Sequence, residues 1–283
     1  MSIWTDLLGA EVKYYQAGPW RTRAVEAGSG TPLILVHGGG GHAETYAKNV
    51  IPLAKKYHVY AIDALAHGLT DAPMDIDVTT QTQAEHVKLF MDAAGIDKAY
   101  VAGESMGGAI LGWLTQKYPE RVLKYVSICG AGLIPPEGKS KQEAAELADQ
   151  VEKTRTALDN PTAAGLRPRM EWLFHDPSQV TDELCETRAA IWGAPAYQSY
   201  QRKPRGAGGG IQSLWPVLPE MGKRTPILFL WTENNPGTHL STAERAQQIT
   251  PNSKIEVMRD CGHWPQWEDV DRFNKILVDF LEA

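Results

Sequence analysis

Hydrophobic and polar residues alternate along the chain in blocks that predict a layered α/β fold. Six nearly continuous hydrophobic runs have the composition of strands that are buried on both faces of a sheet. They are LILVHG at 33–38, HVYAID at 58–63, KAYVAGE at 98–104, KYVSICG at 124–130, ILFLWT at 227–232 and KIEVM at 254–258. Amphipathic stretches that favour helices lie near 43–56, 79–94, 106–118, 241–249 and 269–281. This order predicts a parallel sheet with helices on both faces.

The stretch from about 133 to 219 interrupts the alternation. It is helix-like, charged and punctuated by prolines, and it predicts a helical cap inserted into a core formed by residues 1–132 and 220–283. Near its end, the run RKPRGAGGG at 202–210 is interpreted as a flexible connector. A phosphate-binding loop is the less favoured interpretation, because no strand precedes the run.

Composition and charge narrow the possible partners. With 283 residues, 43% of them hydrophobic, the chain can bury a large core. A net charge of −6 offers no basic surface to nucleic acid or to an anionic membrane. The N-terminal residues lack a secretion signal, so we expect a cytoplasmic protein with a small-molecule substrate. Cys129, Cys185 and Cys261 form no C-x-x-C pair, and we expect them to be reduced, with no metal or cofactor.

The motif GESMG at 103–107 lies between a predicted strand and a predicted helix. In that position, G-x-S-x-G forms a sharp turn that exposes a serine hydroxyl beside the amides of a helix N-terminus. The pattern alone is weak, but its placement favours Ser105 as a nucleophile. The alternative is a glycine-flanked serine with no catalytic role.

The glycine-rich segment HGGGGHA at 37–43 follows the first of these strands. Its backbone amides are candidates for part of an oxyanion hole, since glycines let the backbone approach a substrate closely. A rival interpretation is a dinucleotide-binding loop, in which Gly38, Gly40 and Ala43 fit G-x-G-x-x-A and Asp63 binds the ribose. The rival leaves Ser105 and the C-terminal histidine motif unexplained.

The segment DCGHWPQWE at 260–268 places His263 directly after the last predicted strand. A lone histidine is commonly structural, but a histidine here, in a sheet that carries a nucleophile turn, is a candidate general base. The order of serine, acid and histidine along the chain is that of α/β-hydrolases.

These motifs together resemble the α/β-hydrolase family, and in particular the meta-cleavage product hydrolases, which cut carbon–carbon bonds in ring-opened aromatic compounds. The resemblance rests on HGGG, on D-x-L-x-H-G-L-T-D at 63–71, on G-x-S-M-G-G and on CGHWPQWE. It implies a mostly parallel eight-stranded sheet with an inserted cap. In the cap, VTDELCETR at 180–188 resembles the segment whose arginine contacts the dienoate, which suggests Arg188. The alternative for Arg188 is a solvated position on a helix face.

The resemblance also implies a mechanism. His263 would shuttle protons to ketonise the substrate, Ser105 or a water would then engage the distal carbonyl, and the amides of Gly39 and Met106 would hold the oxyanion. A homodimer would be ordinary for the family. Further substrate contacts are implied or expected at Gly38, Gly40, Trp264, Trp172, Trp192 and Trp215.

Three departures from the family pattern stand out. Glu104 replaces the usual asparagine before the nucleophile, and the glycine loop is shorter; both concern substrate specificity. In the third, Asn235 aligns with the catalytic aspartate that follows the seventh strand. Asn235 could orient His263 through its amide oxygen, or Glu233 could reach the imidazole instead. Glu137 is a more distant candidate acid.

Two other functions use the same residues. A carboxylesterase or lactonase needs the same serine and histidine, and a ligand-binding pseudo-hydrolase would tolerate a missing acid. Arg188 discriminates a dienoate hydrolase from an esterase or lactonase, because a dienoate carboxylate needs a cationic partner and a neutral ester does not.

Overall fold

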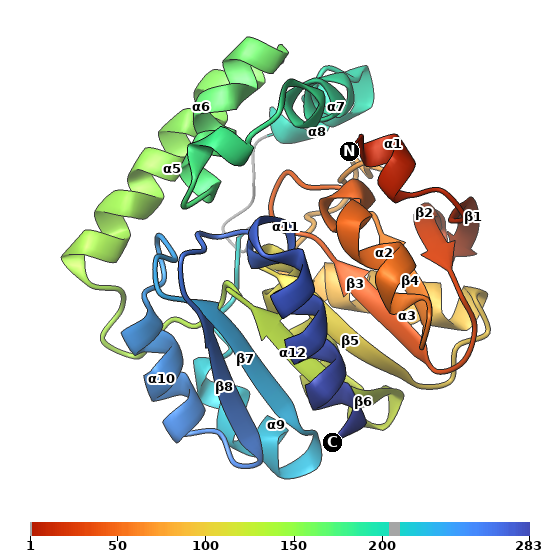
Figure 1. Ribbon diagram of the computed structural model, residues 1–283, viewed down its shortest axis with the longest axis vertical. Coiled ribbons are helices and arrows are strands. Elements are labelled where there is room, and N and C mark those ends of the chain that lie inside the picture. Colours follow the sequence, from red (N-terminus) through yellow and green to blue (C-terminus); the bar gives the residue numbers. More distant parts are fainter. Residues whose placement is uncertain (1, 204–209) are drawn as a thin grey trace.

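The computed structural model describes residues 2–203 and 210–283. These residues form a sheet of eight strands in the order β1-β2-β4-β3-β5-β6-β7-β8 (Figure 1). The pairs β1–β2 and β2–β4 are antiparallel, and the other neighbours are parallel, so the predicted mostly parallel sheet is confirmed. The strands are β1 (Glu11–Ala17), β2 (Trp20–Ala27), β3 (Pro32–Val36), β4 (His58–Ile62), β5 (Ala99–Glu104), β6 (Val122–Ile128), β7 (Ile227–Thr232) and β8 (Ser253–Met258).

Helices cover both faces of the sheet. They are α1 (Ile3–Asp6), α2 (Ala47–Leu53), α3 (Thr80–Ala93), α4 (Met106–Lys117), α5 (Lys141–Asp159), α6 (Ala163–Leu173), α7 (Asp182–Trp192), α8 (Pro195–Gln201), α9 (Leu218–Arg224), α10 (Leu240–Gln248), α11 (Pro265–Glu268) and α12 (Val270–Glu282). Short 3₁₀ turns lie at Ala43–Tyr46, Pro119–Arg121, Pro177–Gln179 and Trp215–Val217.

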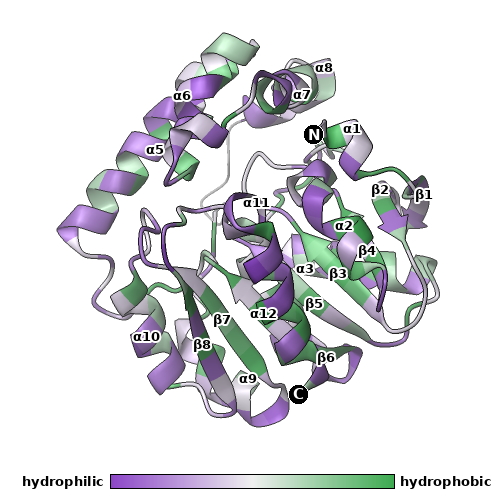
Figure 2. Cartoon of the chain, in the orientation of Figure 1, coloured by the Kyte–Doolittle hydropathy of each residue, from purple (hydrophilic) through white to green (hydrophobic). Residues whose placement is uncertain are grey.

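Alternate residues of the central strands feed two separate hydrophobic cores. Ile34 and Val36 of β3 pack with α3, α4, α9 and α10, whereas Leu33 and Leu35 pack with α2 and α12. Such alternation follows from the two-residue period of a strand. Figure 2 shows the result, with hydrophobic strands inside and hydrophilic residues on the outer sides of the helices.

Helices α5 to α8 stand between β6 and β7 in the chain and lie over one end of the sheet (Figure 1). We refer to them as the cap helices. The glycine-rich run interpreted as a connector falls largely on 204–209, outside the described residues. In the described part of the chain, no helix combines the length and apolar content that crossing a membrane requires. The same residues hold no cluster of three or more side chains suited to a metal ion, and all three cysteines are free and buried.

Candidate active site

Ser105 sits on a strained turn between β5 and α4. Its φ of 51° and ψ of −116° lie outside the regions that non-glycine residues commonly adopt. A Cβ on Gly103 would clash with the backbone of Gly107, and one on Gly107 would clash with the Val36 carbonyl. The two glycines therefore let the turn pack tightly against β3. Strain of this kind persists only where the surroundings hold it, and it is common at active sites.

Backbone amides approach this turn from two directions. Met106 is the first residue of α4, where helix geometry leaves amide groups without intrahelical partners. The four glycines at 38–41, the oxyanion loop, line the same cavity as Ser105. Cap residues hold this loop, since Arg169 Nη2 donates to Gly39 O at 2.9 Å and Trp192 Nε1 donates to Gly40 O at 2.8 Å. A Cβ on Gly39 would meet nothing within 4 Å.

His37 and Asp63 form hydrogen bonds with the backbone in and beside the oxyanion loop. His37 Nδ1 lies 2.7 Å from Gly38 O, and its Nε2 accepts from the Ala64 amide at 3.1 Å. Asp63 is fully buried and accepts from the amides of Ala43 and Leu69, each at 2.7 Å. Both carboxylate oxygens of Asp63 are engaged inside the protein, so neither is free for a ribose, which removes the basis of the dinucleotide interpretation.

The structure brings His263 and Asn235 together. His263 Nδ1 lies 2.6 Å from Asn235 Oδ1, and Asn235 Nδ2 donates to Thr238 O at 2.6 Å. The bond to Thr238 O uses the NH₂ end of the amide, so the oxygen end faces the ring. An amide oxygen can only accept a hydrogen bond, so Nδ1 of His263 carries a proton. Glu233 is exposed at the end of β7, and exposed Glu137 forms an ion pair with Arg245 at 2.5 Å. Neither carboxylate has a contact with His263 in the described residues.

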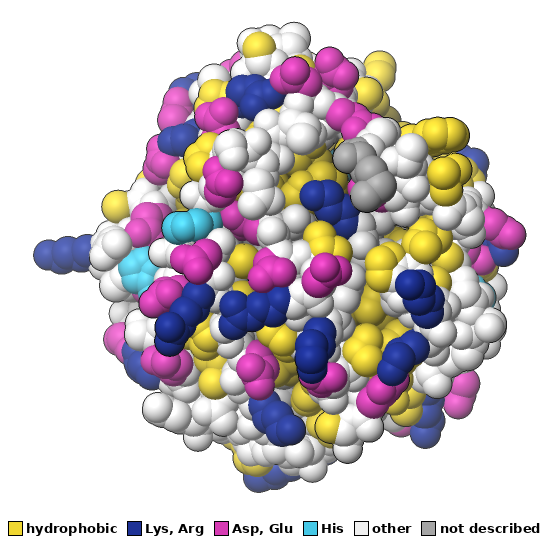
Figure 3. Space-filling model, viewed as in Figure 1, with side chains coloured by type: hydrophobic (Ala, Val, Ile, Leu, Met, Phe, Trp, Pro, Cys, Tyr) yellow, Lys and Arg dark blue, Asp and Glu magenta, His cyan; other side chains and the backbone are white. Residues whose placement is uncertain are grey.

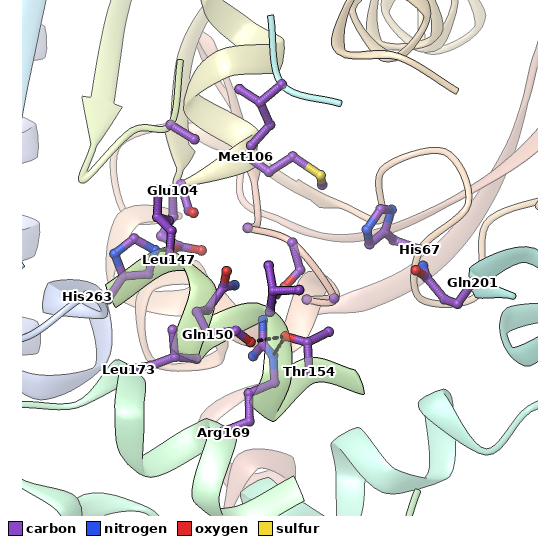
Figure 4. A pocket seen from close by; sticks show the side chains of 18 of the residues that line it. His67, Glu104, Met106, Leu147, Gln150, Thr154, Arg169, Leu173, Gln201 and His263 are labelled. Atoms are coloured by element: carbon purple, nitrogen blue, oxygen red, sulfur yellow. Dashed lines mark hydrogen bonds and ion pairs between the residues drawn. The ribbon is translucent and has the colours of Figure 1, made fainter. Parts of the chain in front are cut away.

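Glu104 is the buried carboxylate beside His263. Its side chain is 1% exposed, and Oε1 lies 3.1 Å from His263 Nε2, a distance typical of an ion pair. The direction does not suit a hydrogen bond, and neither oxygen of Glu104 has a hydrogen-bond partner among the described residues. The carboxylate also packs against Gly38, where a Cβ would clash with it. Figure 4 shows Glu104 and His263 side by side at the edge of the cavity.

The cavity has a volume of about 530 Å³ and lies between the strand ends and the cap helices. Figure 3 shows hydrophobic side chains in a recess between the cap and the core. Ser105, Trp172 and Arg188 also line the cavity. Figure 4 shows Glu104 and His263 on the core side and Leu147, Gln150, Thr154 and Arg169 of the cap on the opposite wall. The size is that of a site for a small organic molecule.

The sequence matches the α/β-hydrolase fold family model over residues 31–270. The chain belongs to the α/β-hydrolase fold family. It is 31% identical to a 2-hydroxy-6-oxo-6-phenylhexa-2,4-dienoate hydrolase of Burkholderia cepacia, over 93% of this chain and 91% of that protein. The predicted resemblance to meta-cleavage product hydrolases is therefore confirmed.

Solved structures show the same likeness. The meta-cleavage product hydrolase from Pseudomonas fluorescens IP01 is 27% identical with a TM-score of 0.80, over 97% of this chain and 98% of that one. A membrane phospholipase A described as a bacterial virulence factor is 26% identical with a TM-score of 0.83, over 98% of this chain and 87% of that one. The hydrolase thus shares its whole architecture with enzymes that act on different bonds.

Two buried arginines face the cavity of this hydrolase. Arg188 is 1% exposed, so it is not a solvated helix-face residue, and its Nε and Nη2 have no hydrogen-bond partner among the described residues. Burial lowers the pKa of Arg188 to about 9, which leaves the guanidinium charged at neutral pH. Burial also lowers the pKa of Arg169, whose Nη1 is likewise without a hydrogen-bond partner in the described ranges. Neither arginine forms an ion pair within the described residues, although Glu104 interacts with both electrostatically, and buried cations with free donors favour an acidic ligand.

The expected tryptophans divide into two groups. Trp264, 2% exposed, lines the cavity and lies under Arg188, whose Cζ is 4.9 Å from its ring centroid. Trp172 and Trp192 also line the cavity. The expectation for Trp215 is wrong, because Trp215 precedes α9 and packs into the core on the α4 side of the sheet.

Sequence reasoning assigned no role to Glu104 or Arg169. The signal for Glu104 was its departure from the family's asparagine next to Ser105. No sequence motif marks Arg169, which the fold of α6 brings over the oxyanion loop.

Proposed function

We propose that this hydrolase cleaves a carbon–carbon bond in a ring-fission dienoate, the meta-cleavage product of an aromatic compound. The observation that carries the proposal is buried Arg188 in the cavity of Ser105 and His263; the Nε and Nη2 of Arg188 have no hydrogen-bond partner in the described part of the chain. A dienoate carboxylate would accept hydrogen bonds from these two donors. The similarity to hydrolases named for such dienoates supports the same substrate class.

Each site residue has a role in this proposal. Arg188 pairs with the substrate carboxylate, and Gly38, Gly40 and Trp264 contact the bound dienoate. His263 moves protons during ketonisation, and Ser105, or a water that it helps to activate, then engages the distal carbonyl. The amides of Gly39 and Met106 stabilise the oxyanion that forms. The cytoplasmic location and the homodimer stay predictions.

The role of Arg188 is tested by Arg188→Met on two substrate types. We expect turnover of a ring-fission dienoate to fall by about 2 to 5 kcal/mol in kcat/KM, the range for breaking a desolvated charge pair. Turnover of a neutral p-nitrophenyl ester should change little, because that substrate has no carboxylate. Arg224→Met is the matched control, since Arg224 lies outside the cavity on α9.

Assays on a dienoate, an ester and a lactone also separate the alternative functions. Efficient turnover of esters or lactones, with weak dienoate turnover and equal losses in Arg188→Met, would identify a carboxylesterase or lactonase. Binding of dienoate without any turnover would identify a pseudo-hydrolase.

Ser105→Ala tests the nucleophile turn. We expect loss of at least about a thousandfold in kcat with substrate binding retained, because the change removes a hydroxyl and no core volume. Single-turnover kinetics and equilibrium binding of the dienoate measure the two effects. A variant with near wild-type kcat contradicts the role of Ser105.

A further inference from the structure

The charge balance around His263 differs from that of a Ser-His-Asp triad. In such a triad, a carboxylate on the Nδ1 side stabilises the imidazolium that forms during catalysis. Here Nδ1 faces the neutral amide of Asn235 at 2.6 Å. The carboxylate lies on the opposite side of the ring, where Glu104 Oε1 is 3.1 Å from Nε2.

The hydrogen-bond directions restrict where protons lie. Asn235 Oδ1 can only accept, so Nδ1 bears a proton. Glu104 Oε1 lies at ion-pair distance from Nε2 without the direction of a hydrogen bond, so the carboxylate can stabilise a positive charge on the ring without itself holding the Nε2 proton. Ser105 Oγ makes no hydrogen bond to His263 among the described residues, so Nε2 is free of the serine in this state.

We propose that Glu104 is the charge partner of His263 and takes over the role of the missing aspartate from the Nε2 side. It is a positioning residue, because it acts on substrate through the imidazole. When His263 accepts a proton at Nε2, the carboxylate of Glu104 stabilises the positive charge of the imidazolium. This stabilisation ends when His263 passes the proton on. The proposal rests on the proposed function only in assuming that His263 transfers protons.

Other ionisable groups face this pair from several elements. Tyr46 and Cys129 interact with Glu104, and burial raises the pKa of each well above neutral, so both stay uncharged. Arg169 of α6 and Arg188 of α7 face it from the cap, and the nearby carboxylate of Glu104 opposes the lowering of the pKa of each arginine by burial. Glu268 accepts from the Gly262 amide next to His263 and points into that loop.

The first test needs no substrate, so its outcome does not depend on the proposed function. Histidine signals are followed by NMR against pH in the wild type, Glu104→Gln and Glu104→Asn, with His263 assigned from its absence in His263→Asn. Removing the carboxylate removes stabilisation of the imidazolium. We therefore expect His263 to titrate at lower pH in both variants, by about one to two units, as for an opposite charge within about 4 to 6 Å. The exposed Glu233→Gln is the matched control and should cause no shift.

The same variants give a stability readout that a structural residue would not give. Glu104 has no hydrogen-bond partner among the described residues and its partner in the ion pair is His263, so the stability that Glu104→Gln removes should depend on pH and be greatest at low pH, where the imidazolium forms. A residue kept for packing would change the free energy of unfolding equally at every pH. The acidic limb of kcat/KM against pH for the dienoate should move to lower pH in Glu104→Gln, in parallel with the NMR shift.

A charge-exchange cycle completes the design, using Glu104→Asn, Asn235→Asp and their double variant. Glu104→Asn should lower kcat by at least about tenfold, the rate equivalent of one lost unit of imidazolium stabilisation. Asn235→Asp should raise kcat much more in the Glu104→Asn background than in the wild type, where the ring already has an anion. An unchanged His263 titration in both Glu104 variants, or equal effects of Asn235→Asp in both backgrounds, overturns the proposal.

Discussion

Asn235 holds the His263 ring through an amide oxygen, and an amide can fix a tautomer without charging it. Its own Nδ2 is bound to Thr238 O at 2.6 Å, so the side chain has no freedom to present its other end. In a triad, one aspartate both orients the histidine and stabilises its charge. In this site Asn235 orients the ring, and the nearby carboxylate belongs to Glu104.

Asn235→Leu tests the orienting role. The change keeps the approximate volume but leaves the Nδ1 proton of His263 without an acceptor. We expect kcat to fall about a hundredfold, or about 2.7 kcal/mol, within the range of a hydrogen bond to a charged group. Glu233→Gln should stay close to wild type in the same steady-state assay. A collapse in Glu233→Gln with a mild effect of Asn235→Leu would instead assign the acid to Glu233.

Part of this site could be predicted residue by residue. The chain order of Ser105, residue 235 and His263, and the strand ends that precede them, place these groups at one edge of a parallel sheet. The contact of Glu104 with Nε2 could not be predicted, because a side chain before the nucleophile has several rotamers and only packing against Gly38 selects this one.

At the scale of elements, the start of α5 clamps the loop that carries Asn235. Glu143 accepts from the His239 amide and from Thr242 Oγ1, each at 2.9 Å, and Glu146 accepts from the Gly237 amide at 2.7 Å. Although burial opposes it, these hydrogen bonds lower the pKa of Glu143 to about 2. The position of the cap is therefore coupled to the loop that orients His263.

Glu143→Ala should loosen this clamp. The change leaves the His239 amide and Thr242 without their acceptor, so we expect a loss of about 1 to 3 kcal/mol in the free energy of unfolding and a lower kcat. Chemical denaturation and steady-state kinetics measure both. Glu152→Ala on the exposed side of α5 is the control and should change neither. An unaffected kcat in a destabilised Glu143→Ala would show that the clamp does not reach His263.

Element prediction succeeded where burial leaves a clear pattern. The six hydrophobic runs are all strands, β3 to β8; β3 to β7 are largely buried on both faces, whereas β8 is an edge strand with one exposed face. The β1–β2 hairpin escaped notice, since β1 is an edge strand whose residues are mostly exposed and form no continuous hydrophobic run. The cap helices were expected only as a helical region, and their ends depend on tertiary contacts such as those of Glu143.

At the scale of the whole molecule, buried neutral histidines set the response to acid. His86 of α3 is fully buried against Thr22 Oγ1 at 2.6 Å, and burial lowers its pKa from 6.5 to about 3. Burial also lowers the pKa of His37 well below its usual value. In both cases the unfolded chain binds a proton that the folded chain refuses, so stability is retained above pH 6.5 and is lost as the pH falls.

The His86 contribution predicts a slope of about 1.4 kcal/mol per pH unit in the free energy of unfolding as the pH falls from about 6 towards 3. His86→Leu should reduce the pH dependence by that slope, even though the loss of the Thr22 contact lowers stability at pH 7. Urea titrations at several pH values measure this. His175→Gln at an exposed position should leave the slope unchanged, and an unchanged slope in His86→Leu contradicts the assignment.

Gly39 gives the scaffold one adjustable position for engineering. In the oxyanion loop, a methyl group at Gly38, Gly40 or Gly41 would collide with Glu104, Trp192 or His37, whereas one at Gly39 would enter open space in the cavity. A library of small residues at position 39 could therefore narrow the site beside the reacting carbonyl without a change of fold. Laboratory selection for a smaller substrate has a direct route through this residue, because the other three glycines of the loop admit no side chain without displacing a neighbour.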